Sequence, residues 1–151
     1  MADIATLAGI AKGTLYNHFR AKEAVFAAAI DAGVQALTDE CITVAGEDLA
    51  DALALGADRL GTHPALRRLA GDEPATLSAL TTIDDSAPWQ SARASVKAIL
   101  DAGGRDATTA NIEIVLRWLV SFVGAPGPEI EAQALVLAKA LPVQSQPQLQ
   151  F

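Results

Sequence analysis

The chain has 151 residues, of which 51% are hydrophobic and only 5% aromatic, and it carries a net charge of −7. Its single cysteine, Cys41, excludes an internal disulfide. No apolar run reaches the roughly 20 residues that a bilayer requires, and Met1 does not open a secretory leader. Because alanine and leucine dominate and β-branched runs are few, we expect an all-α, cytoplasmic protein with no membrane partner.

The charge is distributed unevenly along the chain. Residues 1–24 hold three basic and two acidic residues, whereas the remainder holds eight basic and sixteen acidic ones. The acidic bulk argues against a broad nucleic-acid surface, but it leaves room for a small one at the amino-terminal end.

The first helices are predicted from the spacing of apolar residues. Residues 3–8 and 12–19 form two short helices around a turn at 9–11, and residues 22–45 form one long helix. The long helix is expected to bury a single apolar stripe, made of Phe26, Ile30, Val34, Leu37, Cys41 and Val44.

Glycine and proline divide the rest of the chain into further helices. Apolar spacing between these breaks predicts helices within residues 47–64, 64–71, 73–82, 86–103, 106–124 and 129–141. The segment 106–124 is apolar on almost every side, so we expect it to be buried on two faces. One stripe comprises Ile112, Val115, Leu116, Leu119 and Val123, and the other comprises Ile114, Trp118 and Phe122.

Residues 1–20 have the spacing of a helix-turn-helix unit. The small Ala5 permits a close helix crossing, Gly9 suits the turn, and Ile4, Ile10 and Leu15 fill the wedge. Such a unit presents its second helix to a DNA major groove. On spacing alone, a plain helical hairpin remains an alternative.

The segment DIATLAGIAKGTLYNHFRAKEAVF, residues 3–26, closely resembles the DNA-binding segment of the TetR family of bacterial transcriptional repressors. The shared features are a glycine turn, Lys-Gly-Thr-Leu-Tyr, a His-Phe pair, and Lys-Glu before a long helix. The resemblance covers about residues 3–30 and implies a helix-turn-helix region followed by a helical ligand-binding and dimerisation domain.

The resemblance assigns DNA-binding roles by position. Thr14 and Tyr16 would face bases and phosphates, while Asn17 and His18 would reach the sugar-phosphate backbone. Solvated charges, a half-buried tyrosine and a helix-terminal histidine remain the alternatives. The full set is Lys12, Gly13, Thr14, Tyr16, Asn17, His18 and Lys22.

The chain departs from the family pattern in two ways. Ala11 and Ala21 stand where capping residues are usual, and each could cost about 1 kcal/mol of helix-end stability. The family also places a helix before this segment, so the resemblance implies an amino-terminally truncated DNA-binding region whose first helix is absent.

The side chains outside this segment suggest a binding pocket and no catalytic site. Trp89, Trp118 and Phe122 are candidates to line an effector pocket for a small apolar or neutral ligand, with plain core or dimer contacts as the alternatives. Two distant histidines, one cysteine and no phosphate-binding glycine loop predict no enzyme activity, no cofactor and no metal site.

These features predict a three-part organisation. Residues 1–45 form the DNA-binding region with its connecting helix, 46–141 form the effector-binding and dimerisation domain, and 142–151 form a flexible tail. Helices 106–124 and 129–141 would form a homodimer as a four-helix bundle.

The functional hypothesis is a transcriptional repressor that a small-molecule effector releases from a double-stranded DNA operator. In this hypothesis the effector changes the tilt of helix 22–45 and so the spacing of the two recognition helices. The alternative is a helical dimeric interaction module that has lost DNA binding through the truncation.

Overall fold

The computed structural model describes residues 22–144, with side chains from residue 31 onward. The two predicted short helices at 3–8 and 12–19, and most of the tail, lie outside the described residues. Contacts divide the chain into two compact units, residues 1–35 and 36–151. The division falls within the long helix, and the predicted domain boundary after residue 45 stays a prediction.

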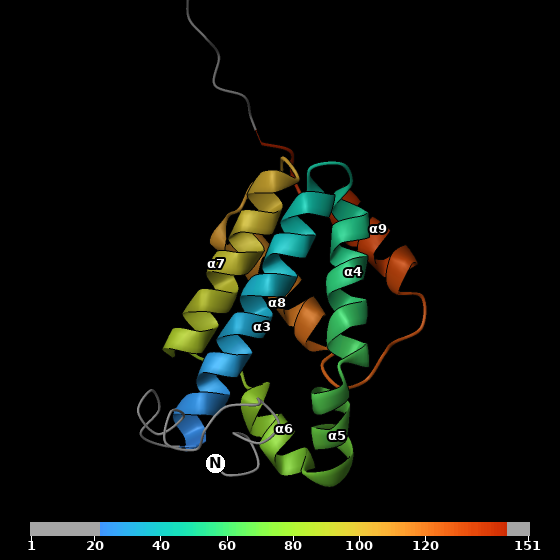
Figure 1. The fold of residues 1–151 in the computed structure, drawn as a ribbon. Helices are drawn as coiled ribbons and strands as arrows, with labels where there is room; N and C mark the ends of the chain where they lie inside the picture. The colour runs from blue at the N-terminus through green and yellow to red at the C-terminus, as the bar shows by residue number, and fades with distance from the viewer. Residues whose placement is uncertain (1–21, 145–151) are drawn as a thin grey trace, which may run out of the picture. The chain divides into compact units, whose positions relative to one another are not determined.

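Every element named within residues 22–144 is a helix, which confirms the all-α prediction (Figure 1). None of these helices is both long enough and apolar enough to cross a membrane. The elements are α3 (Lys22–Ala45), α4 (Leu49–Thr62), α5 (Pro64–Asp72), α6 (Pro74–Leu80), α7 (Ala87–Ala102), α8 (Thr109–Val120) and α9 (Ile130–Ala140).

Helix α4 is the centre of the unit that begins at residue 36. It packs against α7, α8 and α9, and small residues allow these neighbours to come close. Ala52 and Ala57 are completely buried. A Cβ placed on Gly56 would lie 3.3 Å from Leu119 Cδ2 and 3.5 Å from Cys41 Sγ. Helices α3 and α8 therefore both approach α4 at this glycine.

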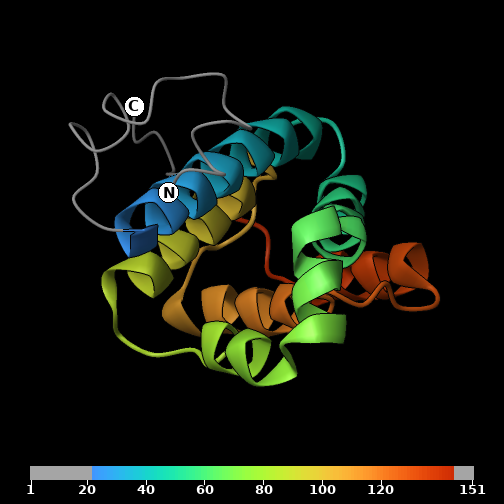
Figure 2. The same ribbon diagram turned by 60° about the horizontal axis from the view of Figure 1, so that its bottom comes forward.

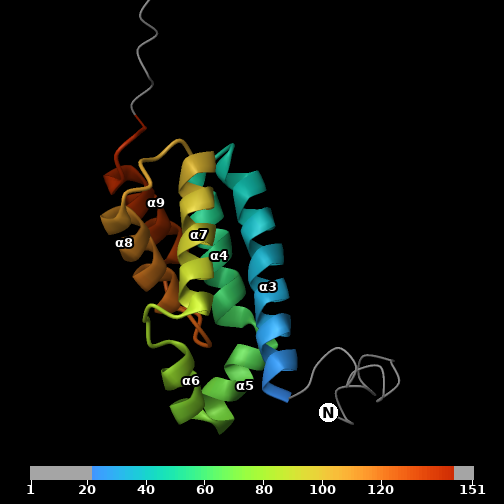
Figure 3. The same ribbon diagram turned by 90° about the vertical axis from the view of Figure 1, so that its left-hand side faces the viewer.

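The packing around α4 forms layers. Helices α4 and α7 lie between α8 and α9 on one side and the later half of α3 on the other (Figure 3). The predicted stripe of α3 is confirmed at Cys41, which is 2% exposed, and at the half-buried Val34, Leu37 and Val44. Burial also raises the pKa of the Cys41 thiol to about 11, which keeps the thiol protonated at neutral pH.

Helices α5 and α6 differ from the rest because neither contains a buried residue. They pack on each other at one end of the unit, and α5 also contacts α4 (Figure 2). The turn after α8 adds a second attachment, since Gly124 donates its N–H to the Leu60 carbonyl at 3.3 Å. A Cβ on Gly124 would lie 3.0 Å from the carbonyl oxygen of Leu66 in α5.

Helix α8 is shorter than the predicted segment 106–124. Thr108 caps its start by accepting the Asn111 N–H at 3.2 Å. After Val120 the chain tightens into turns that end at Gly124, where φ is +76°. Such a left-handed backbone ends a helix and favours glycine.

The expectation that the segment is buried on two faces is wrong at Ile114. The first stripe is buried at Val115, Leu116 and Leu119, whereas in the second Phe122 is buried, Trp118 is half-buried and Ile114 is 53% exposed. The side chain of Ile114 has no neighbouring helix within the described chain to cover it fully. Helix α9 follows the prediction, with Ile130, Ala134 and Leu141 buried and Leu137 half-buried.

Candidate functional site

The predicted DNA-binding residues fall at the edge of the described structure. Lys12, Gly13, Thr14, Tyr16, Asn17 and His18 lie outside the described residues. Helix α3 begins at Lys22, the residue at which the sequence predicts the long helix to begin. The phosphate contact of Lys22 stays a prediction, because the structure describes the backbone of this residue but not its side chain.

Two of the three aromatic residues proposed for an effector pocket contact each other. The rings of Trp118 and Phe122 meet edge to face with centroids 5.0 Å apart. The Trp118 indole N–H donates to Gln133 Oε1 at 3.1 Å, which connects α8 to α9. Phe122 is 4% exposed, so this pair stabilises the junction between the two helices.

The third aromatic residue, Trp89, lies elsewhere. It is half-buried on α7 and packs against the core. Neither of the two hollows described below is lined by Trp89, Trp118 or Phe122. A pocket shared by all three stays a prediction.

Helices α8 and α9 leave large apolar side chains exposed. Ile114 on α8 is 53% exposed, and Leu135 and Val136 on α9 are 44% and 69% exposed. We call these three residues the α8–α9 apolar residues. They belong to the two helices that the sequence assigns to dimerisation.

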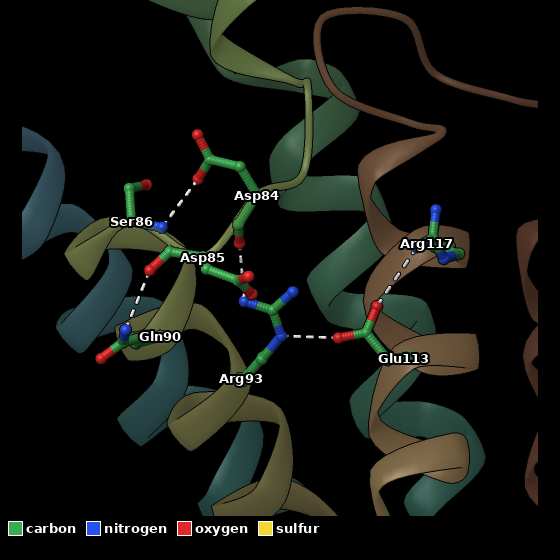
Figure 4. Close-up of polar contacts among 7 residues, drawn as sticks. All are labelled: Asp84, Asp85, Ser86, Gln90, Arg93, Glu113 and Arg117. Atoms are coloured by element: carbon green, nitrogen blue, oxygen red, sulfur yellow. Dashed lines mark hydrogen bonds and ion pairs between the residues drawn. The ribbon is translucent and has the colours of Figure 1, made fainter.

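A polar cluster joins the segment between α6 and α7 to α8 (Figure 4). Arg93 on α7 donates through Nε to Glu113 Oε1 at 2.5 Å, and through Nη1 to the Asp84 carbonyl at 2.8 Å. Arg117 also reaches Glu113, at 3.4 Å. The Arg93 and Glu113 side chains are only about a quarter exposed, at 26% and 24%.

The cluster shifts the titration of its carboxylates. The hydrogen bond from Arg93, helped by the charges of Arg93 and Arg117, holds the pKa of Glu113 below its ordinary value. Hydrogen bonds from Ser86 similarly lower the pKa of Asp84. Asp84 and Glu113 are therefore both ionised at neutral pH, which suits a structural connection between α7 and α8.

Two open hollows mark the surface of the described unit. The first, of about 490 Å³, lies where the α3–α4 turn, the α7–α8 loop and α9 meet, and Arg105 and Lys139 are among its lining residues. The second, of about 410 Å³, lies between α4 and the α8–α9 loop and is lined by the carboxylates of Asp58, Glu129 and Glu131. Among the side chains that the structure describes, residues 31–144, no set of three potential metal ligands is grouped.

The comparison with protein families identifies the amino-terminal segment. Residues 1–29 match the family model described as "Bacterial regulatory proteins, tetR family". The match covers the amino-terminal segment alone and shows what these residues are similar to. It overlaps the segment on which the sequence-based resemblance rests. Searches of the curated proteins and of the solved structures each gave no match.

Sequence reasoning missed two structural features outside the matched segment. Arg93 and Glu113 are 20 residues apart on different helices, so no local spacing reveals their pairing. Arg105 follows Gly103-Gly104, and this glycine pair indicated only the end of a helix. The position of Arg105 in a hollow depends on the packing of α9 against α4, and no local sequence pattern predicts that packing.

Proposed function

We propose that the chain is a ligand-responsive transcriptional repressor, acting in the cytoplasm as a homodimer that a small molecule releases from a double-stranded DNA operator. The single observation that carries this proposal is the tetR-family match at residues 1–29. The long helix α3 supports it as well, because it continues from that segment into the α4-centred unit. A helix that belongs to both units can transmit a change of packing in one to the orientation of the other.

The dimer in this proposal forms through α8 and α9. The α8–α9 apolar residues support it, since exposed Ile, Leu and Val side chains on neighbouring helices favour association with an apolar partner. A second copy provides such a partner through a twofold contact, in which each chain uses the same surface. The dimer would hold two recognition helices about 34–36 Å apart, one turn of DNA.

Fluorescence anisotropy with palindromic DNA selected from a random library tests the DNA-binding part. We expect the logarithm of affinity to fall linearly with the logarithm of salt concentration, because phosphate contacts release counterions. Lys22→Ala should weaken binding to all sequences and reduce the salt slope by about 1. Lys97→Ala is the matched control, because Lys97 pairs with Asp101 within α7.

The same experiment separates the repressor from a dimeric interaction module. The module would form the dimer but show no saturable, salt-dependent binding to any selected DNA. A repressor of its own promoter should in addition reduce reporter expression in cells, and an activator should increase it.

A further inference from the structure

The hollow beside Arg105 has the dimensions of a small-molecule site. Its volume of about 490 Å³ falls within the roughly 300–1,000 Å³ that ligand pockets occupy. It is formed by three segments that are distant in sequence: the α3–α4 turn, the α7–α8 loop and the end of α9. Leu49, Leu135, Ala45 and Ala138 contribute apolar surface to it.

Arg105 has an unmet hydrogen-bonding requirement at this hollow. Its Nε is buried and has no hydrogen-bond partner. No ion pair joins its guanidinium to another residue of the part of the chain that the structure describes. Arginine stays charged at all physiological pH values, so the group cannot relieve this cost by losing a proton. A buried donor left unpaired is rare in native proteins, and an ordered water, an ion or a ligand supplies the partner in such cases.

The backbone holds Arg105 in place. Its N–H donates to the Leu100 carbonyl at 2.9 Å, and the residue forms an antiparallel bridge with Val143. The side chain can change rotamer, but the residue cannot move away from the hollow without breaking these contacts. The loop therefore keeps a guanidinium at this position.

The hollow is lined by two basic and two acidic residues, Arg105 and Lys139 against Glu47 and Asp48, and these charges differ in whether they have partners. Lys139 on α9 lines the same hollow and takes part in none of the ion pairs among the described side chains of residues 31–144. Of the two acidic lining residues, Asp48 already accepts the Ala50 and Asp51 N–H groups at 2.6 and 3.2 Å as the cap of α4. Glu47 is exposed and free to face solvent.

We propose that this hollow binds a small organic carboxylate with an apolar body. The guanidinium of Arg105 donates to the carboxylate, for which its planar fork is well matched, and Lys139 supplies a second positive charge. The apolar part of the ligand lies against Leu49 and Ala138. The effector role of such a ligand rests on the proposed function above, whereas its binding does not.

Isothermal titration calorimetry of the full chain without DNA tests the site, with octanoate as the probe and octanamide as its neutral match. We expect saturable binding of one octanoate per chain and at least tenfold weaker binding of octanamide. Arg105→Met should reduce octanoate affinity about ten- to a hundredfold, in line with a charge-assisted hydrogen bond. Arg67→Met is the control, because Arg67 is an exposed arginine on α5, away from the hollow.

The stability of the variant distinguishes lost binding from lost folding. Arg105→Met removes an unpaired buried donor while keeping the length of the side chain, so its melting temperature without ligand should equal or exceed that of the original chain. If the variant unfolds, Lys139→Met gives the same test, because Lys139 is exposed on α9 and its replacement should also weaken octanoate binding.

Three results would overturn the proposal: no saturable octanoate binding, equal affinity for octanamide, or unchanged affinity in both Arg105→Met and Lys139→Met. Inorganic phosphate binding as tightly as octanoate would also overturn it, since the apolar lining would then contribute nothing. Because no DNA is present, a failure of DNA binding leaves these results interpretable.

Discussion

Helix α4 and the pair α5–α6 follow each other in the chain but are stabilised in different ways. Within α4, seven residues are buried, and α7, α8 and α9 all pack against it. Within α5 and α6 no residue is buried, and the pair is attached through α4 and through the turn that contains Gly124. The chain therefore combines a closely packed centre with a weakly packed end.

This contrast predicts two levels of stability in one unit. Segments with little buried apolar surface open at lower free energy than the packed core to which they are attached. We expect amide exchange to be faster in residues 64–80 than in α4. Segments that open easily are also the ones that respond to ligands and partners, so α5–α6 is the first place to look for conformational change.

The largest effect should come from the packed centre. Leu53 on α4 is 1% exposed, so Leu53→Ala should reduce the free energy of unfolding by about 2–5 kcal/mol. The matched control, Leu80→Ala at the end of α6, should cost less than about 1 kcal/mol because Leu80 is 46% exposed. Urea denaturation measures both, and equal losses would contradict the contrast between the two regions.

An intermediate effect should come from the attachment of α5–α6. Gly124 and Gly104 both have positive φ, +76° and +64°, so replacement by alanine costs about 1–2 kcal/mol of backbone strain at each. A new Cβ at Gly124 would also meet the Leu66 carbonyl, whereas the same atom at Gly104 would meet nothing within 4 Å. Gly124→Ala should therefore be the more destabilising variant.

Hydrogen–deuterium exchange locates this effect. Gly124→Ala should speed exchange in α5 and α6 more than in α4, and Gly104→Ala should leave α5 and α6 unchanged. If both variants altered exchange equally in α5 and α6, the contact between Gly124 and α5 would not be what holds the pair.

The smallest effect should appear as a change in pH dependence. The folded chain lowers the pKa of Glu113 below its ordinary 4.5, so this group contributes stability above its ordinary pKa that is lost as pH falls through the lower, folded value. Glu113→Gln should make stability fall less steeply between pH 7 and about pH 3. The control Asp39→Asn removes an exposed carboxylate of α3 that takes part in none of the ion pairs of the described side chains, and it should change stability at pH 7 less than Glu113→Gln does.

Local sequence patterns were sufficient for most of the helices that the structure describes. The 24-residue α3 and the 16-residue α7 follow directly from apolar spacing and from the breaks at Gly46 and Gly103. The exposure of Ile114 in the second stripe could not be predicted, because apolar spacing shows which residues share a face, but not whether another helix covers each of them. Ile114 is therefore apolar and exposed at once.

The candidate sites also differ in how far the sequence predicts them. The predicted DNA-binding segment consists of consecutive residues, so its sequence alone showed the family resemblance, and the match at residues 1–29 supports that resemblance. The Arg105 hollow and the Arg93–Glu113 pair depend on which helices pack together. Such groupings of distant residues follow from tertiary structure and leave no local signal.

The most direct test of the central claim, a dimeric DNA-binding regulator, is the affinity of Val136→Glu for palindromic DNA. Val136 is 69% exposed on α9, so the variant should fold normally but sediment as a monomer. It should bind the palindrome at least tenfold more weakly than the original chain and bind a single half-site equally well. Unchanged affinity for the palindrome would contradict the claim.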